Sequence, residues 1–535
     1  MMQLPKEKPF DRPTRKITAR AAVSAAALAA AGLSGCAVGP DFVSPPAPDV
    51  SRFTPENLSS VGGRPLVVKD EIPKRWWEVF HNKNLNRLVE ATIEHNPSLQ
   101  AAEASIKTAY FAAEAQKGGF LPSALLNWSD TNNLQSGVQN TVTPNAFTNP
   151  YGLFLRQVSV SYTPDIWGQN RRAVESLEAQ TDQQRYQLEA TYLSLTSNVA
   201  TAAVTEASLR GQIAATRHVI NIEEHLLGLL RRQYAIGSVA QSDVLTQEAQ
   251  LAQVMQLLPP LEKQLAQQRD LLTALAGRYS TAQAPETFTM NAVSLPRDLP
   301  LTLPSSFVRQ RPDVRAAEAA MHSASAQIGV AIAARLPNVT LSTQNGFSAY
   351  SYAQLFTPGT GFYTLAAGAT QPLFDGFALL NKQKAAEAGL VQAEANYRQA
   401  VITGFQNVAD ALRALQADAK AVKAAVYAET TARKSLDIIR KQLDFGSVNV
   451  LALLNAEQTY LQASVARVQA EGSRLADVVA LFMALGGGWK DENLKRLSPD
   501  APRENPFSGW GSPAPQEVDK IDGPVNSSWF PSFWD

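Results

Sequence analysis

Two similar stretches, 215 positions apart, decide the fold of this chain of 535 residues. The first reads Asn96-Pro97-Ser98-Leu99-Gln100-Ala101-Ala102-Glu103, and the second reads Arg311-Pro312-Asp313-Val314-Arg315-Ala316-Ala317-Glu318. Leu121-Pro122 follows the first stretch and Leu336-Pro337 follows the second, and these two pairs are also 215 positions apart. Further along, Gly237-Ser238-Val239 matches Gly446-Ser447-Val448. Because similarity at a fixed spacing is the signature of a repeated structure, the sequence predicts two repeats with one order of elements.

Hydrophobic periodicity predicts what those elements are. A helix is expected over 99–117 and again over 314–334, and two strands are expected after each helix. Along these strands apolar and polar residues alternate, so each strand has one apolar and one polar face. The expected strands cover 123–129, 154–162, 339–344 and 362–371.

Long stretches without proline follow the second strand of each repeat, over 171–236 and 377–444. At about 1.5 Å per residue, each stretch predicts a helix roughly 100 Å long. Val401, Val408 and Leu415 recur every seven residues, which is typical of coiled-coil packing. The return helices repeat this spacing, and Pro259-Pro260 is expected to kink or break the first of them.

The composition excludes several classes of protein. Lys and Arg number 48, as do Asp and Glu, so the chain lacks the basic excess expected of a nucleic-acid-binding protein. One cysteine and five histidines show no zinc-site spacing, and no metal or cofactor is expected. We find no nucleophile motif or phosphate-binding Gly-rich loop, so the protein is not expected to be an enzyme. Glu223-Glu224 and His225 lie on a predicted coiled-coil helix, where a solvated surface is the expected explanation.

Residues 1–35 have the pattern of a signal peptide. Basic residues within 12–20 precede an apolar run, 21–33, which is too short to span a bilayer. The run ends in Leu33-Ser34-Gly35-Cys36, which is similar to the bacterial lipobox and contains the one cysteine of the chain. We therefore expect Cys36 to carry acyl chains, palmitate among them, that anchor the mature protein in lipid; Ala37 after it favours the outer membrane. An ordinary signal peptide followed by a chance cysteine is the alternative.

Four amphipathic strands and two long helical hairpins do not bury their apolar faces within one chain. Because open strand edges are not tolerated in lipid, a membrane barrel requires several copies of the chain. Polar strand faces are then expected to line a lumen, and apolar faces to meet lipid. The aromatic residues expected on the lipid side are Trp128, Tyr162, Phe347, Phe362 and Tyr363. A soluble β-layer that caps a coiled coil is the alternative.

Several short motifs together resemble those of the TolC-like outer-membrane factor family, and more narrowly its NodT-type lipoprotein branch, which serves resistance-nodulation-division (RND) efflux systems. Besides the lipobox they are Val38-Gly39-Pro40-Asp41-Phe42, Trp76-Trp77, Pro164-Asp165-Ile166-Trp167-Gly168 and Gln371-Pro372-Leu373-Phe374-Asp375-Gly376. The resemblance covers residues 36–489. It implies an α+β chain with internally duplicated long α-helical hairpins that form a periplasmic α-barrel, and four strands that contribute to a trimeric 12-stranded transmembrane β-barrel.

The function implied by the resemblance is the outer-membrane exit duct of a tripartite efflux system. Its partners would be two further copies of the chain, outer-membrane lipid, a periplasmic adaptor (membrane fusion protein) and an inner-membrane RND pump. The expected divisions are a signal peptide (1–35), an anchor and linker (36–75), a first repeat (76–277), an equatorial linker (278–304), a second repeat (305–488) and a tail (489–535). A structural coiled-coil envelope lipoprotein without transport, a spacer or adhesin, is the alternative, and a solute-binding or degradative enzyme comes third.

The turns between the long helices, at 234–244 and 445–454, are the expected periplasmic tip. Gly237 and Gly446 suit helix ends in left-handed geometry, and turns that only reverse the chain are the alternative. The residues that the resemblance implies for adaptor docking are Gly237, Ser238, Val239, Ser242, Asp243, Gly446, Ser447 and Val448.

The second of these turns is also the expected periplasmic gate. Many similar proteins carry two acidic residues three positions apart there, but this chain has Ala452 and Asn455. The sequence therefore predicts a gate that closes through apolar contact, with Asp243 as the remaining carboxylate. The expected gate residues are Asp243, Leu451, Ala452, Leu453, Leu454 and Asn455.

Overall fold

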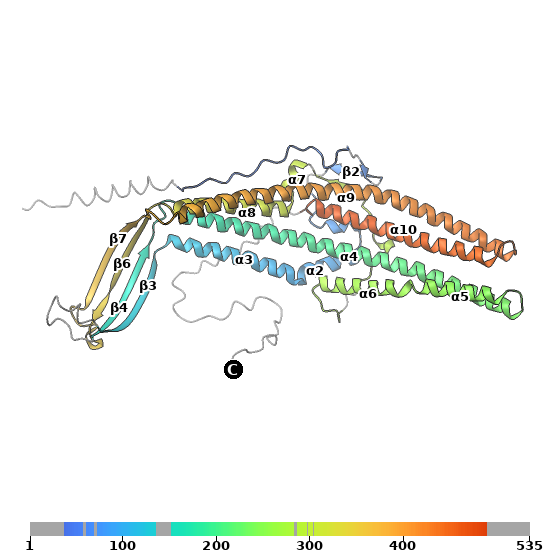
Figure 1. Cartoon of the computed structure of the whole chain (residues 1–535), viewed down its shortest axis with the longest axis horizontal. Helices are drawn as coiled ribbons and strands as arrows, with labels where there is room; N and C mark the ends of the chain where they lie inside the picture. Colours follow the sequence, from blue (N-terminus) through green and yellow to red (C-terminus); the bar gives the residue numbers. More distant parts are fainter. Residues whose placement is uncertain are drawn as a thin grey trace, which may run out of the picture. The chain divides into compact units, whose positions relative to one another are not determined.

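The computed structural model describes residues 37–56, 60–61, 63–68, 72–134, 151–282, 286–296, 298–302 and 304–488 (Figure 1). All of them belong to one unit of the chain, and the second unit, Asp491–Asp535, lies outside them. The signal peptide and Cys36 also lie outside the described residues, as do the tail and most of the loop that joins the first two long strands.

The order of elements predicted for each repeat is observed. In the first half the elements are α2 (Lys83–His95), α3 (Pro97–Lys117), β3 (Ser123–Asn133), β4 (Tyr151–Tyr162), α4 (Gln169–Ala235), α5 (Gln241–Met255) and α6 (Leu258–Leu275). In the second half they are α7 (Pro304–Gln310), α8 (Pro312–Ala333), β6 (Asn338–Ala349), β7 (Gly361–Thr370), α9 (Ala378–Asp444) and α10 (Val450–Ala484). The long helices α4 and α9 contain 67 residues each.

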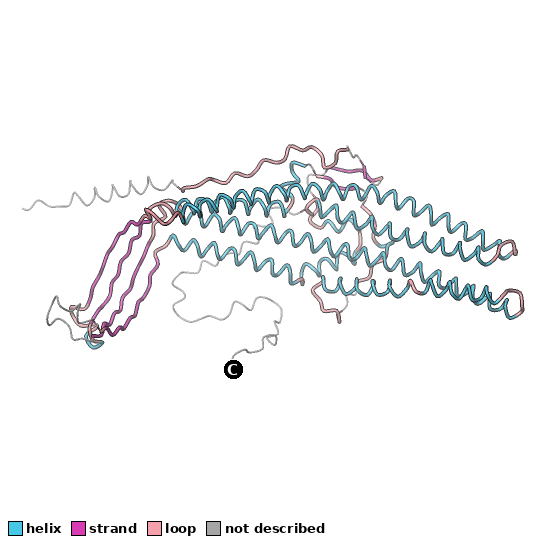
Figure 2. Tube along the Cα trace, in the orientation of Figure 1, coloured by secondary structure: helices cyan, strands magenta, loops and turns pink. Residues whose placement is uncertain are grey.

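The four long strands form one antiparallel sheet in the order β3-β4-β6-β7 (Figure 2). Its register aligns side chains of one kind across the strands: Leu126 lies opposite Val158, and Val160 opposite Thr343, which in turn lies opposite Leu365. On the other face Ser123 lies opposite Ser161, which lies opposite Ser342. The predicted apolar and polar faces are therefore aligned across these strands, although Leu153 and Leu155 lie on the polar face and Asn345 lies on the apolar face.

One predicted lipid-facing residue lies on the other face. Phe362 precedes Tyr363 in β7 and pairs with Gly346, so it belongs to the polar face. The prediction that both aromatic residues meet lipid was wrong, because neighbours in a strand point to opposite sides. Gly346 also allows β4 and β6 to approach closely, since a Cβ atom there would lie 2.7 Å from the Cα atom of Gln157.

The helices pack into a layered bundle along α4 and α9. Helix α4 contacts α3, α8 and α10, and α9 contacts α8 and α10. Trp76, Trp77 and Phe80, in the short helix η1 (Trp76–Phe80), are fully buried in the main core of the bundle. The predicted break before Pro259-Pro260 is present, since α5 ends at Met255 and α6 begins at Leu258.

A second, small sheet joins segments that are distant in sequence. It has the order β1 (Ser60–Val61), β2 (Arg64–Val68) and β5 (Leu299–Leu301). Strand β2 pairs in parallel with β5, so that Leu66 lies opposite Leu299. The early segment and the linker between the repeats are thus held together, beside the bundle.

None of the helices in the described ranges combines the length and the apolar character needed to cross a membrane.

Candidate channel and docking sites

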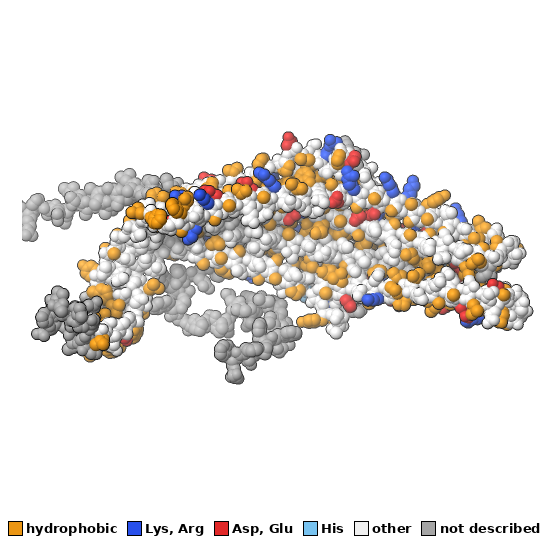
Figure 3. Space-filling view, in the orientation of Figure 1, with side chains coloured by type: hydrophobic (Ala, Val, Ile, Leu, Met, Phe, Trp, Pro, Cys, Tyr) orange, Lys and Arg blue, Asp and Glu red, His pale blue; other side chains and the backbone are white. Residues whose placement is uncertain are grey.

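The apolar face of the long sheet is uncovered in a single chain. Leu126 is 69% exposed, Trp128 68%, Tyr363 81% and Leu365 81%. The outermost strands of the sheet, β3 and β7, each pair on one side within the chain. In Figure 3 the blue and red of charged side chains gather over the helices, whereas the strands carry mainly orange and white. Within one chain this sheet therefore leaves a large apolar surface and two strand edges without a partner, which is typical of an interaction surface.

The charged residues within the bounds of the four long strands are Asp130 and Arg156, and they pair with each other. The guanidinium of Arg156 donates to both carboxylate oxygens of Asp130, at 2.5 and 3.1 Å, and stacks over the ring of Trp128 at 4.0 Å. Both lie on the apolar face, because Arg156 pairs with Trp128 and Phe347 across the sheet. Charges on such a face are tolerated when they are paired, as these are. The Arg156 side chain is also mostly buried, whereas that of Asp130 is 46% exposed. The sequence analysis did not single out this pair.

The first described residues lie at the junction of strands and helices. The backbone N–H of Val38 donates to the carbonyl oxygen of Trp167 at 3.1 Å, five residues after β4 ends. Arg172 of α4 holds the same segment, since it donates to the carbonyl oxygen of Val38 at 3.2 Å and pairs with Asp41 at 2.6 Å. Residue 37 is therefore fixed beside the end of the strands.

Packing at this junction leaves no room for larger residues. A Cβ atom at Gly168 would lie 2.7 Å from the Cα atom of Ala37, and Gly168 has a φ of +77°. The ring of Phe42 stacks on His322 at 4.4 Å, and His322 lies 2.9 Å from a carboxylate oxygen of Glu175. These contacts explain two of the motifs singled out in the sequence, at 38–42 and 164–168.

The two turns predicted as docking sites lie at the same end of the helices, away from the sheet (Figure 1). Gly237 and Gly446 have φ of +75° and +66°, which confirms the predicted left-handed geometry. The serine after each glycine donates its backbone N–H to a carbonyl oxygen in the last turn of the long helix. Ser238 donates to Gln233 and Ser447 donates to Gln442, both at 2.8 Å. The other docking candidates are exposed at Ser242 and Asp243, and half-buried at Val239 and Val448.

The turns differ in how the following helix begins. In the first, the carboxylate of Asp243 accepts a hydrogen bond from the N–H of Ala240 at 3.2 Å. In the second, the side chain of Asn449 accepts from the N–H of Ala452 at 3.0 Å. Asp243 therefore has a local structural role, helix capping, in addition to the predicted role at the gate.

The predicted gate residues fall into two groups. Leu453 and Leu454 are each 5% exposed and pack in an apolar cluster with residues of α4, α5 and α9. Leu451 is 57% exposed, Asn455 is exposed and Ala452 is half-buried. Within one protomer, Leu451 is the leucine of this turn that is free to contact another copy.

Glu223 was predicted to lie on a solvated surface, and that prediction was wrong: its side chain is fully buried, whereas Glu224 and His225 are exposed as predicted. The sequence contained a signal for this. Glu223 lies seven residues before the fully buried Leu230 and seven after the buried Thr216, so it occupies the core stripe of the helix. Glu457 of α10 is also buried, at 1% exposure, and was not singled out at all.

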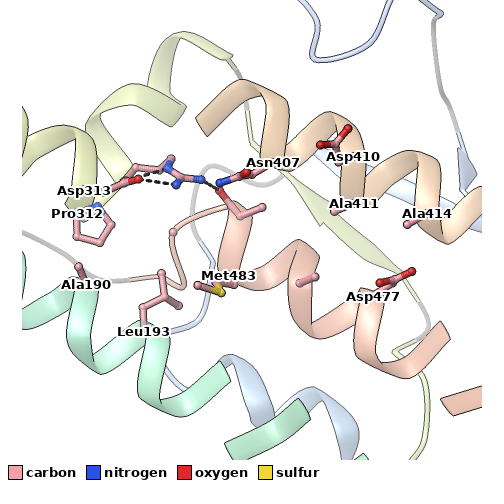
Figure 4. Close-up of a pocket in the computed structure, with 14 residues that line it drawn as sticks. Ala190, Leu193, Pro312, Asp313, Asn407, Asp410, Ala411, Ala414, Asp477 and Met483 are labelled. Carbon is pink, nitrogen blue, oxygen red and sulfur yellow. Dashed lines mark hydrogen bonds and ion pairs between the residues drawn. The ribbon is translucent and has the colours of Figure 1, made fainter. Parts of the chain in front are cut away.

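A cavity of about 500 Å³ lies among α4, α8, α9 and α10 (Figure 4). Its residues on α4, Ala190 and Leu193, are nearer to the start of the helix, which follows β4, than Glu223 is. Arg311 at its edge bonds to both carboxylate oxygens of Asp313, at 2.9 and 2.6 Å, and to the carbonyl oxygen of Ala484 at 2.6 Å. Asp477 lines the cavity, and burial, next a hydrogen bond that protonated Asp418 donates to Asp477, and the negative charge of Asp477 raise the pKa of Asp418 to about 6. Arg311 thus ties the start of α8 to the end of α10.

This fold is shared with solved outer-membrane channels. The CmeC outer membrane channel of Campylobacter jejuni matches with a TM-score of 0.79 over 87% of this chain and 98% of that one, at 20% identity. The outer membrane protein VceC of Vibrio cholerae matches with a TM-score of 0.71 over 78% of this chain and 100% of that one, at 25% identity.

Sequence relatives agree with this class. The pyoverdine export outer membrane protein OpmQ of Pseudomonas putida is 27% identical over 425 residues, which cover 79% of this chain and 90% of OpmQ. Nodulation protein T of Rhizobium leguminosarum bv. trifolii is 25% identical and covers 85% of this chain and 95% of that protein. The chain belongs to the outer membrane efflux protein family, whose model matches residues 88–278 and 303–487.

Proposed function

We propose that the protein is the outer-membrane exit duct of an efflux system, which passes substrates from an inner-membrane pump and a periplasmic adaptor to the exterior. The observation that carries this function is the long sheet, with one exposed apolar face, one polar face and two outer edges. A polar face opposite an apolar one suits a water-filled lumen within lipid, whereas a spacer does not require lumen-facing alternation. Purified protein in planar bilayers should give single-channel currents. Silence at every pH, salt concentration and voltage would favour the coiled-coil spacer or adhesin.

We further propose that the duct is a homotrimer. Four strands per chain give twelve in three copies, which joins the open edges of β3 and β7 into a closed barrel. The duplicated hairpins α4–α5–α6 and α9–α10 then form the periplasmic α-barrel, with 278–304 and the small sheet around its middle. Mass measurement of the protein in detergent should give three copies, and a monomer or dimer would exclude this barrel.

A lipid anchor at Cys36 is part of the proposal. It is supported by the attachment of residues 37–41 beside the ends of the strands, because a barrel of these strands has its periplasmic rim there. Acyl chains on Cys36 would then enter the neighbouring leaflet without stretching the chain. Cys36→Ser should abolish labelling by radioactive palmitate and leave the trimer intact, because barrel closure depends on the strands. A wild-type protein that takes up no label would contradict the anchor.

The two helical turns are the proposed contact with the adaptor, and an RND pump is the proposed source of substrate. Ser238 and Ser447 are exposed, occupy equivalent positions in the two turns and contribute only backbone N–H groups to the helix ends. Ser238→Arg with Ser447→Arg should therefore weaken adaptor binding by at least tenfold and leave conductance unchanged. Equal binding by the variant would exclude the turns as the docking surface. Ser98→Arg, at an exposed serine near the start of α3 whose backbone N–H likewise bonds at a helix end, is the control.

A further inference from the structure

A layer of buried polar side chains interrupts the apolar core of the helical bundle near the turns. Glu223 of α4, Gln247 of α5 and Glu457 of α10 are each at most 1% exposed. On the side of the turns they are followed by an apolar cluster that includes Leu230, Val244, Leu436 and Leu453. On the other side lies a second cluster, of Val219, Ile220, Val254 and Leu461. The layer is thus closed off from both directions along the helices.

The hydrogen bonds of this layer are incomplete. The amide of Gln247 donates to the Oε2 atom of Glu223 and, at 3.3 Å, to its backbone carbonyl oxygen. Arg440 of α9 reaches the Oε1 atom of Glu457 at 3.3 Å. Among the described residues no partner is found for Oε1 of Glu223, Oε1 of Gln247 or Oε2 of Glu457. Each side chain therefore keeps one buried oxygen that can accept a hydrogen bond, and on the two glutamates this oxygen can also bind a proton.

The charges of the layer do not balance when both glutamates are ionised. Helix α4 contributes Glu223, α10 contributes Glu457 and α9 contributes Arg440, whereas α5 contributes only the neutral amide of Gln247. Two carboxylates thus face one guanidinium. Burial, and next the negative charge of Glu223, raise the pKa of Glu457 to about 7, and burial also raises the pKa of Glu223. A buried charge without compensation is strongly unfavourable, and binding one proton removes it.

We propose that this layer is a proton-dependent lock between the two helical hairpins, in which one proton held by Glu223 and Glu457 keeps the layer neutral and the hairpins packed. When the proton leaves for water, the excess negative charge favours separation of the hairpins, because separation exposes the carboxylates. This inference goes beyond the proposed duct and depends on it only in placing the hairpins at the periplasmic end.

The sign of the pH dependence follows from linkage. Separated hairpins expose their glutamates to water, where the pKa is about 4.3, whereas the packed layer holds its proton up to about pH 7. The packed state therefore binds more protons between these values, and its packing is strongest at acid pH. The equilibrium constant for separation should rise about tenfold per pH unit up to about pH 7 and then level off.

Hydrogen–deuterium exchange of the full-length protein in detergent measures this equilibrium without requiring transport. After correction for the chemical exchange rate, protection of amides in 219–230 and 453–461 should fall roughly a hundredfold between pH 5 and pH 8. Glu457→Gln, which keeps the shape and cannot ionise, should retain at pH 8 most of its protection at pH 5. Glu248→Gln, in the exposed pair with Arg231 on the same side of the bundle, should keep the wild-type profile.

Three results would overturn the lock. Protection in the wild type that is equal at pH 5 and pH 8 excludes proton control. A wild-type slope that persists in both Glu457→Gln and Glu223→Gln assigns it to other groups, and the second variant covers a failure of the first to fold. Protection that returns at pH 8 when Na⁺ or Mg²⁺ is added assigns the layer to a cation. Failure of the proposed duct would instead appear as absent conductance, whatever the exchange profile.

Discussion

The two helical hairpins have the same length of long helix and the same glycine ends, yet they differ in the return arm and in buried charge. The arm α10 is one helix of 35 residues, whereas the first arm is divided at Gln256-Leu257 into α5 and α6. Inside the bundle, Glu223 of the first hairpin bonds to a neutral amide, and Glu457 of the second pairs with Arg440. Apolar register and helix ends are thus common to both hairpins, while helix continuity and polar partners are not. The common features stabilise the fold. The features that differ allow the two hairpins to respond differently to mutation and to pH.

A proline in the undivided arm should have the largest effect on stability. Ala470 of α10 lies 210 positions after Pro260, and Ala470→Pro removes a helical hydrogen bond and creates a clash, at about 3 kcal/mol or more. In the first arm Pro260 lies in the first turn of α6, where its missing N–H has no helical partner, so Pro260→Ala should change stability by under about 1 kcal/mol. Urea unfolding followed by circular dichroism measures both. Equal losses would show that the two arms are equivalent after all.

The next largest difference in stability is expected between variants of Arg440 and of Arg231, which occupy matching places in the two hairpins. Arg440→Met leaves buried Glu457 without its cation and should lower stability by about 2 kcal/mol at pH 8, since Arg440 is itself partly solvated. The loss should shrink at pH 5, because Glu457 is then protonated and carries no charge to compensate. Arg231→Met breaks an exposed pair with Glu248 and should change stability by at most about 0.5 kcal/mol at either pH. Urea unfolding at the two pH values tests this. An Arg440→Met protein as stable as the wild type at pH 8 would show that Glu457 does not carry an unfavourable buried charge.

Substitution of the glycine at the end of each long helix, by contrast, should lower stability equally in the two hairpins. Gly237 and Gly446 have positive φ, and a Cβ atom added at either would meet no atom within 4 Å. Gly237→Ala and Gly446→Ala should therefore each lower stability by about 1 kcal/mol, from backbone strain alone. Thermal unfolding of the two variants beside wild type is the comparison to make. A clearly larger loss at one glycine would reveal a contact in the assembled protein that only one turn makes.

The smallest effect concerns the charge of the two turns. The first turn carries Asp243, whereas the second carries Ala452 and Asn455, so block of conductance by divalent cations from the periplasmic side should be weak. Asn455→Asp adds one carboxylate per copy around the axis of the proposed trimer and should strengthen the block. Conductance titrated with Mg²⁺ measures it. Strong block that persists in Asp243→Asn would show that other carboxylates govern the mouth and that the alignment of the turns is misplaced.

Sequence patterns were sufficient for features set by neighbours along the chain. Alternation predicted the strand faces, long stretches without proline predicted the long helices, and the glycines at 237 and 446 predicted the left-handed ends. Features set by contacts between distant segments were not predictable in this way. The pairing of Asp130 with Arg156 depends on strand register, and the burial of Glu457 depends on which helices face it. The burial of Glu223, in contrast, was indicated by its seven-residue spacing from Thr216 and Leu230. The prediction for Phe362 failed for a different reason. Strict alternation already placed Phe362 and Tyr363 on opposite faces of the strand, but both residues are apolar, and both were therefore assigned to the lipid side.

The central claim is that the polar face of the sheet lines a conducting lumen and the apolar face meets lipid. Ser161 and Val160 are neighbours in β4 on opposite faces, and Cys36→Ser removes the one native cysteine. In that background, a charged thiol reagent should reduce the single-channel conductance of Ser161→Cys and leave that of Val160→Cys unchanged. Reduced conductance at Val160→Cys with no change at Ser161→Cys, or no current from either protein, would contradict the account.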